Sequence, residues 1–287
     1  MVEIKVRRFK SNPIIYPDLD PSIGSNIAGP SLIRVPSWSV NPLGKYYLYF
    51  AGHKGKFIRL AYTNQLEGPW EIYKKGSLHI EESHFPTEPP EEKIRSDIRD
   101  ENVPHIASPD VHVNEYTKEF RMYFHGLESK GRQLTRYALS TDGIHFKTNP
   151  EVLIPPYLRV FYFNGFYYGM CMPGMFYRSL NSLHHFERGP RIFPVTMRHS
   201  ALRISDKTLQ VFWTNVGDSP ERILLSCINL AEDWSSWKPS APIEVMRPVK
   251  DWEGGNFDTI PSERGPIYDK VCQLRNRFVI FGKNFNK

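Results

Sequence analysis

The hydrophobic positions of this chain gather in short aromatic and β-branched runs, not in the i, i+3, i+4 stripes of amphipathic helices. Each run is bounded by Gly, Pro, Asn or Asp, residues that favour turns. The first set of runs covers residues 29–35, 44–50 and 57–63 and closes on Trp70. The pattern predicts β-strands joined by short structured loops, and therefore an all-β fold.

The same order of runs recurs along the chain: a first strand, an aromatic second strand, a third strand and a closing aromatic residue. The copies begin at five positions: Gly29, Ser108, Arg159, His199 and Gln273. One such β-meander cannot bury both of its faces, whereas copies packed around an axis can. We expect a single domain over residues 1–287, a five-bladed β-propeller whose short fifth blade is closed by an N-terminal strand over residues 3–9. A β-sandwich is the alternative arrangement of these strands.

Composition argues against several classes of protein. The formal net charge is +6, but Lys and Arg are scattered without a long basic run, which disfavours a nucleic-acid partner. The three cysteines form no CxxC pair, so neither a disulfide framework nor a zinc knuckle is indicated. The N-terminus lacks the apolar core of a signal peptide, and no apolar run is long enough to cross a membrane. We therefore expect a cytoplasmic protein with no membrane partner and no cofactor.

The geometry of a propeller predicts where a site would lie. In each blade the first strand lines the channel and successive strands are antiparallel, so the start of strand one, the end of strand two and the start of strand three share one end. Loops at such an end of a rigid scaffold often carry function. The polar residues placed there are candidate ligand-binding groups: His53, Arg59, His105, Asp110, His125, Arg159, Arg198, His199, Asp218 and Arg222.

Some members of this set have more than one possible role. His53 and His125 close the aromatic second strands of the first two blades, so we expect them at equivalent places facing one mouth of the channel. The arginines can hold a carboxylate or sulfate on a sugar, or they can tie neighbouring blades together through ion pairs. Glu221 directly precedes Arg222, and we expect it to be the salt-bridge partner of that arginine.

The repeated blades and the polar residues at one end of the channel resemble the five-bladed propellers of glycoside hydrolase families 43, 32 and 117. Nearly the whole chain is also similar to a group of bacterial family-43-like proteins. That likeness is carried by residues 26–36, 105–113, 217–223 and 252–255. In family 43 the first blade opens with Asp-Pro-Ser, whose Asp is the general base, and the second with Pro-Asp-Val, whose Asp tunes a pKa and positions the substrate. Residues 108–111, Ser-Pro-Asp-Val, match the second pattern, so the resemblance gives that role to Asp110.

The first family pattern is broken in this chain. Gly29 stands at the position of the general base, and Asp20, which opens an upstream Asp-Pro-Ser, is not followed directly by an aromatic strand. Ordinary family-43 inverting chemistry is therefore not expected. The resemblance still implies a small carbohydrate ligand, which the arginines and histidines would suit if it were acidic.

Hydrolysis of a glycosidic bond normally needs two carboxylates flanking that bond. Besides Asp110, the candidate is Glu253, in a glycine-containing loop beside Trp252, whose ring could stack on a sugar. His199 is the alternative proton donor, because histidine titrates near neutrality and family 117 is thought to use a histidine as its acid. Asp110 and His112 lie two apart on one strand and point the same way, which makes them weak candidates for metal ligands.

The leading hypothesis is a glycoside hydrolase that acts on a small glycan at the channel mouth. A degenerate propeller that binds a carbohydrate or an anion without hydrolysing it is the first alternative, and a structural interaction module is the second. Two carboxylates about 5 to 10 Å apart across the mouth would favour the enzyme. A lone carboxylate among arginines and histidines would favour binding.

Overall fold

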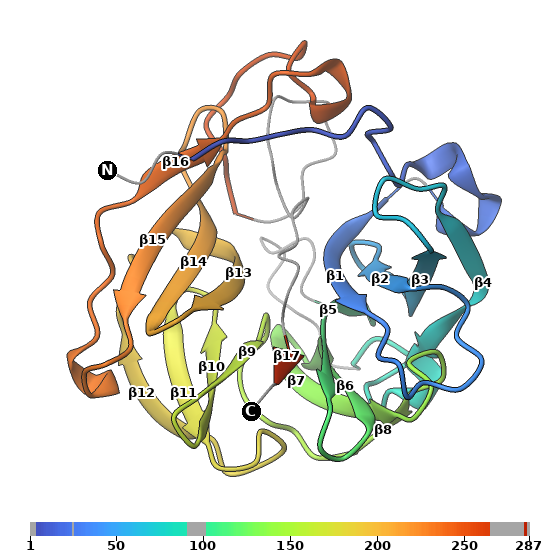
Figure 1. Ribbon diagram of the computed structural model, residues 1–287, viewed down its shortest axis with the longest axis horizontal. Helices are drawn as coiled ribbons and strands as arrows, with labels where there is room; N and C mark the ends of the chain where they lie inside the picture. Colours follow the sequence, from blue (N-terminus) through green and yellow to red (C-terminus); the bar gives the residue numbers. More distant parts are fainter. Residues whose placement is uncertain (1–3, 25, 91–101, 265–283, 286–287) are drawn as a thin grey trace.

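The computed structural model describes residues 4–24, 26–90, 102–264 and 284–285. These residues form four sheets arranged around a central axis, each built from consecutive antiparallel strands, as predicted for an all-β propeller (Figure 1). Blade one contains β1 (Ala28–Arg34), β2 (Tyr46–Ala51), β3 (Phe57–Thr63) and β4 (Glu71–His79). Blade two contains β5 (Ile106–Asn114), β6 (Glu119–Ser129), β7 (Arg132–Ser140) and β8 (Lys147–Thr148).

The other two blades follow the same order. Blade three contains β9 (Arg159–Phe163), β10 (Phe166–Cys171), β11 (Met175–Ser179) and β12 (Glu187–Arg191). Blade four contains β13 (Met197–Ser205), β14 (Thr208–Asn215), β15 (Ile223–Asn229) and β16 (Ile243–Met246). A last short strand, β17 (Asn284–Phe285), pairs in parallel with the end of β5.

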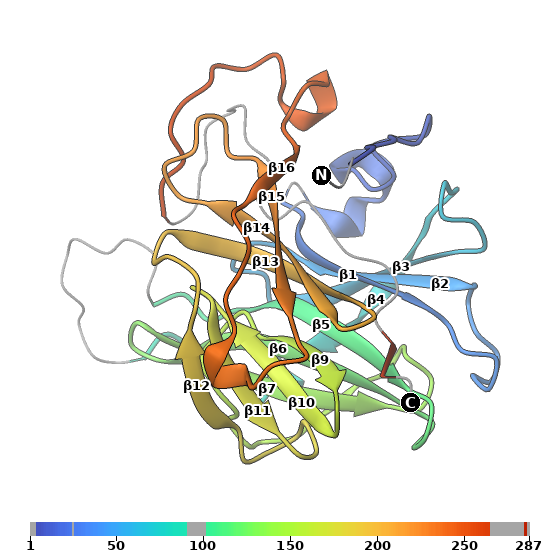
Figure 2. The same ribbon diagram turned by 60° about the vertical axis from the view of Figure 1, so that its left-hand side comes forward.

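The described residues form four blades, so the expectation of five is corrected for this part of the chain. The segment expected to begin the fifth blade at Gln273 lies outside the described residues. Residues 4–9 form no strand. Instead, Arg8 forms an ion pair with Glu253 beyond the last blade, and the Ser11 hydroxyl donates to the carbonyl of Glu67 in blade one (2.5 Å). The N-terminal segment therefore links blade four to blade one through side chains, at the end where both views show it beside the chain that follows β16 (Figures 1 and 2).

The hydrophobic core lies between neighbouring blades. Tyr47 and Tyr49 of β2 pack with Phe120 and Phe124 of β6 in the cluster between blades one and two. Separate clusters join blade two to blade three and blade three to blade four. The aromatic second strands that marked each repeat in the sequence are therefore the surfaces on which blades pack, because a single meander leaves these large side chains in water.

Each blade has one residue in the left-handed region at or just before the start of its first strand. Register shifts place Gly29 (φ 60°), Ser108 (φ 52°) and His199 (φ 39°) in β-bulges at the starts of β1, β5 and β13. Tyr157 (φ 62°) comes just before β9. Such conformations cost free energy in non-glycine residues, and bulges often turn a side chain towards a functional site. The fold therefore presents one residue per blade at the same end of the channel.

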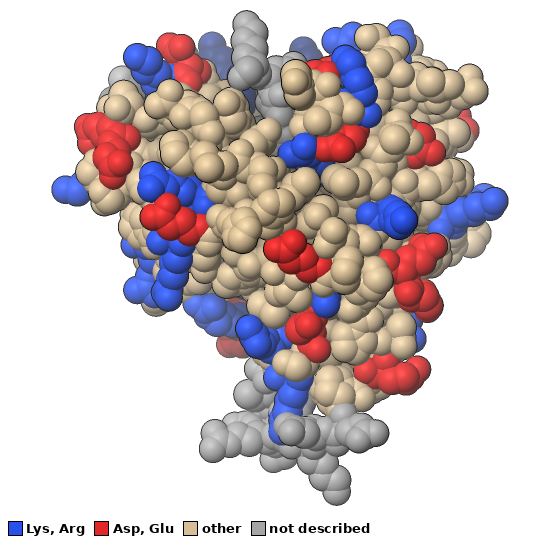
Figure 3. Space-filling view, turned by 90° about the horizontal axis from the view of Figure 1, so that it is seen from below, with Lys and Arg blue, Asp and Glu red and all other residues tan. Residues whose placement is uncertain are grey.

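The surface carries charges of both signs. On the face shown in Figure 3, lysine and arginine side chains alternate with aspartate and glutamate, and no single-sign patch dominates. In the part of the chain that the structure describes, no helix is long and apolar enough to span a membrane.

Candidate functional site

A row of four aromatic rings runs from blade two to blade four. The ring centroids of His105 and His125 are 5.9 Å apart, and His125 lies 4.3 Å from Tyr157. Tyr157 lies 6.1 Å from His199. Two of these residues, Tyr157 and His199, are the left-handed residues of their blades, so the bulge geometry helps to build the row.

The histidines of this row are nearly buried. His105 and His125 are 5% and 2% exposed, respectively, and burial lowers the pKa of each. The neighbouring charges of His105 and Arg159 lower the pKa of His125 further, to well below its usual value, so that its imidazole is neutral at pH 7. Its Nδ1 atom has no hydrogen-bond partner among the described residues. A buried, unpaired nitrogen of this kind suits a ligand hydroxyl that can complete the bond.

Glu221 stands at the blade-four end of the row. Its carboxylate is fully buried, and Oε1 lies 3.8 Å from His199 Nδ1 and 3.8 Å from Arg198 Nε. Burial opposes its ionisation, but the hydrogen bond with His199 and the charge of Arg198 hold its pKa below the usual value. Glu221 is thus an ionised carboxylate held between a histidine and an arginine.

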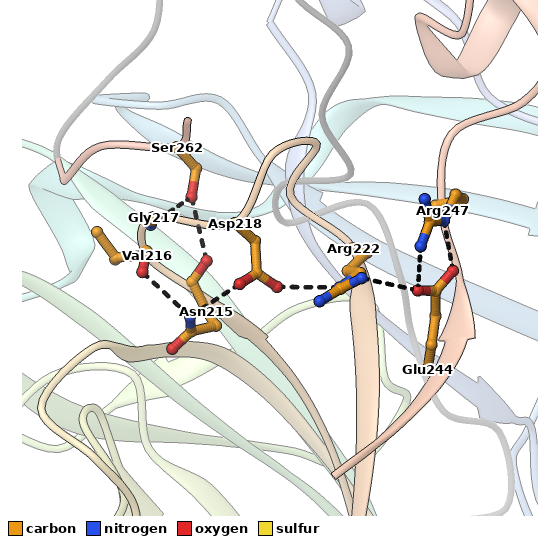
Figure 4. Close-up of polar contacts among 8 residues, drawn as sticks. All are labelled: Asn215, Val216, Gly217, Asp218, Arg222, Glu244, Arg247 and Ser262. Carbon is orange, nitrogen blue, oxygen red and sulfur yellow. Dashed lines mark hydrogen bonds and ion pairs between the residues drawn. The ribbon is translucent and has the colours of Figure 1, made fainter. Parts of the chain in front are cut away.

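The expected pairing of Glu221 with Arg222 is not found. Arg222 instead bonds to the Asp218 carboxylate (3.2 Å) and to Glu244 (3.0 Å), which also binds Arg247 (Figure 4). The two residues lie just before β15 and face different surroundings, since Glu221 is fully buried whereas the Arg222 side chain is 36% exposed.

The outward group in Figure 4 is a structural network. Asp218 also accepts a hydrogen bond from Asn215 Nδ2 (2.9 Å), and the Ser262 hydroxyl donates to the Asn215 carbonyl (3.1 Å). These contacts hold the chain after β16 against the β14–β15 connection. Asp218 and Arg222, which we expected to bind ligand, instead form contacts that hold these segments of the chain together.

Asp110 links two blades. Its Oδ2 atom accepts a hydrogen bond from the Val160 amide of β9 (2.9 Å) and lies 2.8 Å from His112 Nε2. The Asp110 side chain is fully buried. The Arg159 guanidinium donates to the carbonyls of Ser108 and Ser200 (3.1 and 3.0 Å), so it joins three first strands. Among the described residues, no group of three or more histidine, cysteine or acidic side chains is placed to hold a metal.

Gly29 and Ser108 meet where the first two blades touch. A Cβ atom added to Gly29 would lie 2.9 Å from the Ser108 Cα and 3.0 Å from its Oγ. The position that the sequence resemblance assigned to a general base is therefore closed by the neighbouring blade, and it has a φ of 60°, which disfavours any residue with a side chain.

Glu253 is held by the N-terminal segment and by the loop in which it lies. Its carboxylate accepts from the Arg8 guanidinium (2.5 and 3.0 Å) and from the amides of Val249 and Lys250 (2.9 and 3.1 Å). Burial raises its pKa, but these hydrogen bonds outweigh that effect and the pKa is lowered. Trp252 beside it is 41% exposed.

The strand register corrects the expected equivalence of His53 and His125. Ala51 pairs with Ala28 in blade one, and His125 pairs with Ala107 at the same place in blade two. His125 is thus equivalent to Ala51, and His53 lies two residues further on, beyond the end of β2. The His53 amide donates to the Asn26 side chain (2.7 Å), and its imidazole is exposed.

Tyr157 is the site residue that the repeat pattern missed, because it lies in the connection before β9 and not in a strand. One signal was present in the sequence. Tyr157 stands two positions before Arg159, as Ser108 stands two positions before Asp110, and both have a positive φ. Spacing within the repeat was therefore enough to suggest this position, whereas the contact of its ring with His125 could not be read from the sequence.

Comparisons with known proteins give one clear relative in sequence and several in structure. No family model matches the chain. The uncharacterized protein R118 of Acanthamoeba polyphaga mimivirus is 31% identical over 310 residues, which cover 97% of this chain and 85% of that protein.

Solved structures similar to this chain include family 43 glycoside hydrolases. The GH43 protein BlXynB of Bacillus licheniformis gives a TM-score of 0.54 at 15% identity, covering 80% of this chain and 42% of that one. An exo-β-1,3-galactanase of Phanerochaete chrysosporium, solved with β-1,3-galactotriose, gives 0.52 at 13%, covering 77% and 51%. The compost-metagenome β-xylosidase/α-arabinofuranosidase CoXyl43, solved with xylotriose, gives 0.53 at 12%, covering 76% and 78%. The chain thus spans about half the length of the first two, and at these identities the likeness shows the fold alone.

Proposed function

Because the chain belongs to the same family as the mimivirus protein R118 and has a propeller fold like that of family 43 glycoside hydrolases, we propose that it binds a small carbohydrate at the channel mouth. The ligand lies along the ring row from His105 to His199. The observation that carries the proposal is this row itself, in which near-buried rings with polar edges cross from one blade to another.

The row has the chemistry that sugars require. A sugar has apolar faces that stack on rings and a rim of hydroxyls that need hydrogen-bond partners. Tyr157 offers a ring and a hydroxyl, and the neutral His125 offers a nitrogen without a partner among the described residues. Both come from connections or strand ends held in place by inter-blade packing, which limits the entropy lost on binding.

Binding is favoured over hydrolysis because the carboxylates named here are committed to other contacts. Asp110 accepts a backbone hydrogen bond from the next blade, and Glu253 is bonded to Arg8. Glu221 faces Arg198 and His199, and its lowered pKa makes it a poor proton donor at neutral pH. A carboxylate held in this way among cationic partners is the arrangement that favours a binding protein.

Hydrolysis is the second candidate, and one contact favours it. His199 Nδ1 lies 3.8 Å from Glu221 Oε1, so the carboxylate can orient the imidazole and stabilise its protonated form. His199 would then transfer a proton to the leaving group, with Glu221 as the positioning residue.

The test measures binding and turnover on the same protein. Xylotriose and β-1,3-galactotriose are titrated by calorimetry, and product release is followed by chromatography over long incubations. Binding without turnover, weakened at least tenfold by Tyr157→Ala, supports the proposal. The control is Tyr116→Ala, because Tyr116 is 96% exposed and lies in the turn between β5 and β6. Turnover that is lost in both His199→Gln and Glu221→Gln would replace binding by hydrolysis, and no binding of any sugar would reject the proposed function.

A further inference from the structure

Arg59 is a buried cation whose charge is not matched within the described residues. It is 9% exposed, and its guanidinium lies over the rings of Phe57 and Phe50, with Cζ 5.2 and 5.8 Å from the two centroids. Its Nη1 donates to the carbonyl of Asn26 (2.7 Å), and Nε has no partner in the part of the chain described. A guanidinium has five N–H donors, and leaving most of them unused in a buried place is costly.

Blade two shows how the same position is satisfied elsewhere in this chain. Arg59 pairs with Phe50 across β2 and β3, and Arg136 pairs with Phe124 across β6 and β7. Because Ala51 and His125 are equivalent by register, Arg59 and Arg136 are equivalent too. Arg136 also stacks on a ring, that of Phe85 at 4.3 Å, but its guanidinium is bound by the carboxylate of Glu128. Among the described residues, blade one supplies no such carboxylate to Arg59.

His53 lies next to Arg59, because both contact Asn26. The Asn26 carbonyl accepts from the Arg59 guanidinium, and the Asn26 side chain accepts from the His53 amide. His53 is exposed as a residue, but partial desolvation of its ring lowers its pKa, and the charges of Lys54 and Arg198 lower it further. His53 also interacts electrostatically with His105 and His125, so this corner adjoins the ring row.

We propose that Arg59 binds an anionic group on the sugar, a carboxylate or a sulfate, with His53 beside it. This deepens the proposed function and rests on it, because it names the class of carbohydrate as acidic. The anion takes the place that the Glu128 carboxylate occupies in blade two. It accepts hydrogen bonds from the Arg59 guanidinium, which two rings and the Asn26 carbonyl already orient. Bidentate contacts to a carboxylate or sulfate are the geometry that arginine favours.

The experiment compares sugars that differ in one charged group. Galactose is set against galacturonic acid and galactose 6-sulfate, and glucose against glucuronic acid, by calorimetry at low salt. The variants are Arg59→Gln and, as the matched control, Arg136→Gln, which removes the equivalent arginine from blade two. Circular dichroism checks that each variant folds. Sodium sulfate alone serves as the probe for an anion without a sugar.

Three outcomes bear on the inference. Acidic sugars that bind at least tenfold more tightly than their neutral partners, with this preference lost in Arg59→Gln and kept in Arg136→Gln, establish it. A preference for the carboxylate or for the sulfate then identifies the anion. Equal affinity for neutral and acidic sugars, or a preference that survives Arg59→Gln, overturns the inference and leaves carbohydrate binding standing. Arg59-dependent binding of sulfate with no binding of any sugar would instead keep the anion site and reject the proposed function.

Discussion

Ser31 and Asp110 occupy equivalent positions in the first strands of blades one and two, and each accepts a hydrogen bond from the first strand of the following blade. Val111 N donates to Ser31 Oγ at 2.9 Å, and Val160 N donates to Asp110 Oδ2 at 2.9 Å. Strand register supports the equivalence, because Ser31 pairs with Tyr49 and Asp110 pairs with Tyr123, one bulge after Ala28 and Ala107. Asp110, which the sequence resemblance assigns to catalysis, thus forms a structural hydrogen bond between two blades, as Ser31 does. We call this its strut role.

Asp110→Ala is expected to destabilise the fold. It leaves the buried amide of Val160 and the ring of His112 without their acceptor, which costs about 1–3 kcal/mol for each such group. Asp110→Asn keeps an acceptor oxygen and should cost less. Urea unfolding measures both. If Asp110→Ala abolished turnover or binding while its unfolding midpoint stayed at the wild-type value, the strut role would be wrong.

Gly29→Asp introduces the residue that the family-43 pattern has at this position. We expect the variant to be less stable than wild type and to show no hydrolysis. The backbone φ of 60° and the contact with the Ser108 Cα at 2.9 Å both oppose a side chain, at a combined cost of more than about 1 kcal/mol. Thermal unfolding checks this. Ser108→Gly removes only the Oγ and Cβ contacts, so the double variant should recover part of the loss. A Gly29→Asp protein as stable as wild type would contradict the geometry.

The stability of the protein should fall as the pH drops below about 6.5, in part because of His125. Its folded-state pKa lies well below the ordinary 6.5, so the unfolded chain takes up a proton in that window while the folded protein does not. This group alone contributes a slope of up to about 1.4 kcal/mol per pH unit. Urea unfolding between pH 7 and pH 5 should therefore show a shallower loss for His125→Gln than for wild type. Parallel pH profiles would show that His125 is not held neutral.

Arg8 and Glu253 should behave as a coupled structural pair. Their contact joins the N-terminal segment to the loop after β16, and the Glu253 side chain is 1% exposed. A double-mutant cycle with Arg8→Ala and Glu253→Gln is expected to give a coupling energy of about 0.5–3 kcal/mol in unfolding.

Carbohydrate affinity, measured on the same proteins, should stay within twofold of wild type in all three variants. A loss of binding or turnover in Glu253→Gln, with Arg8→Ala unaffected, would return Glu253 to the site.

The repeat in the sequence was sufficient to predict the propeller. Aromatic runs at fixed order report strand pairing and blade packing, because each meander must bury its large side chains against the next. The number of blades was not decided by this pattern. The described residues form four, and the N-terminal segment joins the ends by the Arg8–Glu253 pair, a contact across 245 positions that no local pattern encodes.

The sequence by itself determined which residue types stand near the mouth, including His105, His125 and His199. Only the tertiary structure decided their partners. Whether a carboxylate is a strut, as Asp110 is, or a channel group, as Glu221 is, depends on which neighbour lies within hydrogen-bond distance. Strand register settles that choice, since one bulged residue changes the face on which every following side chain projects.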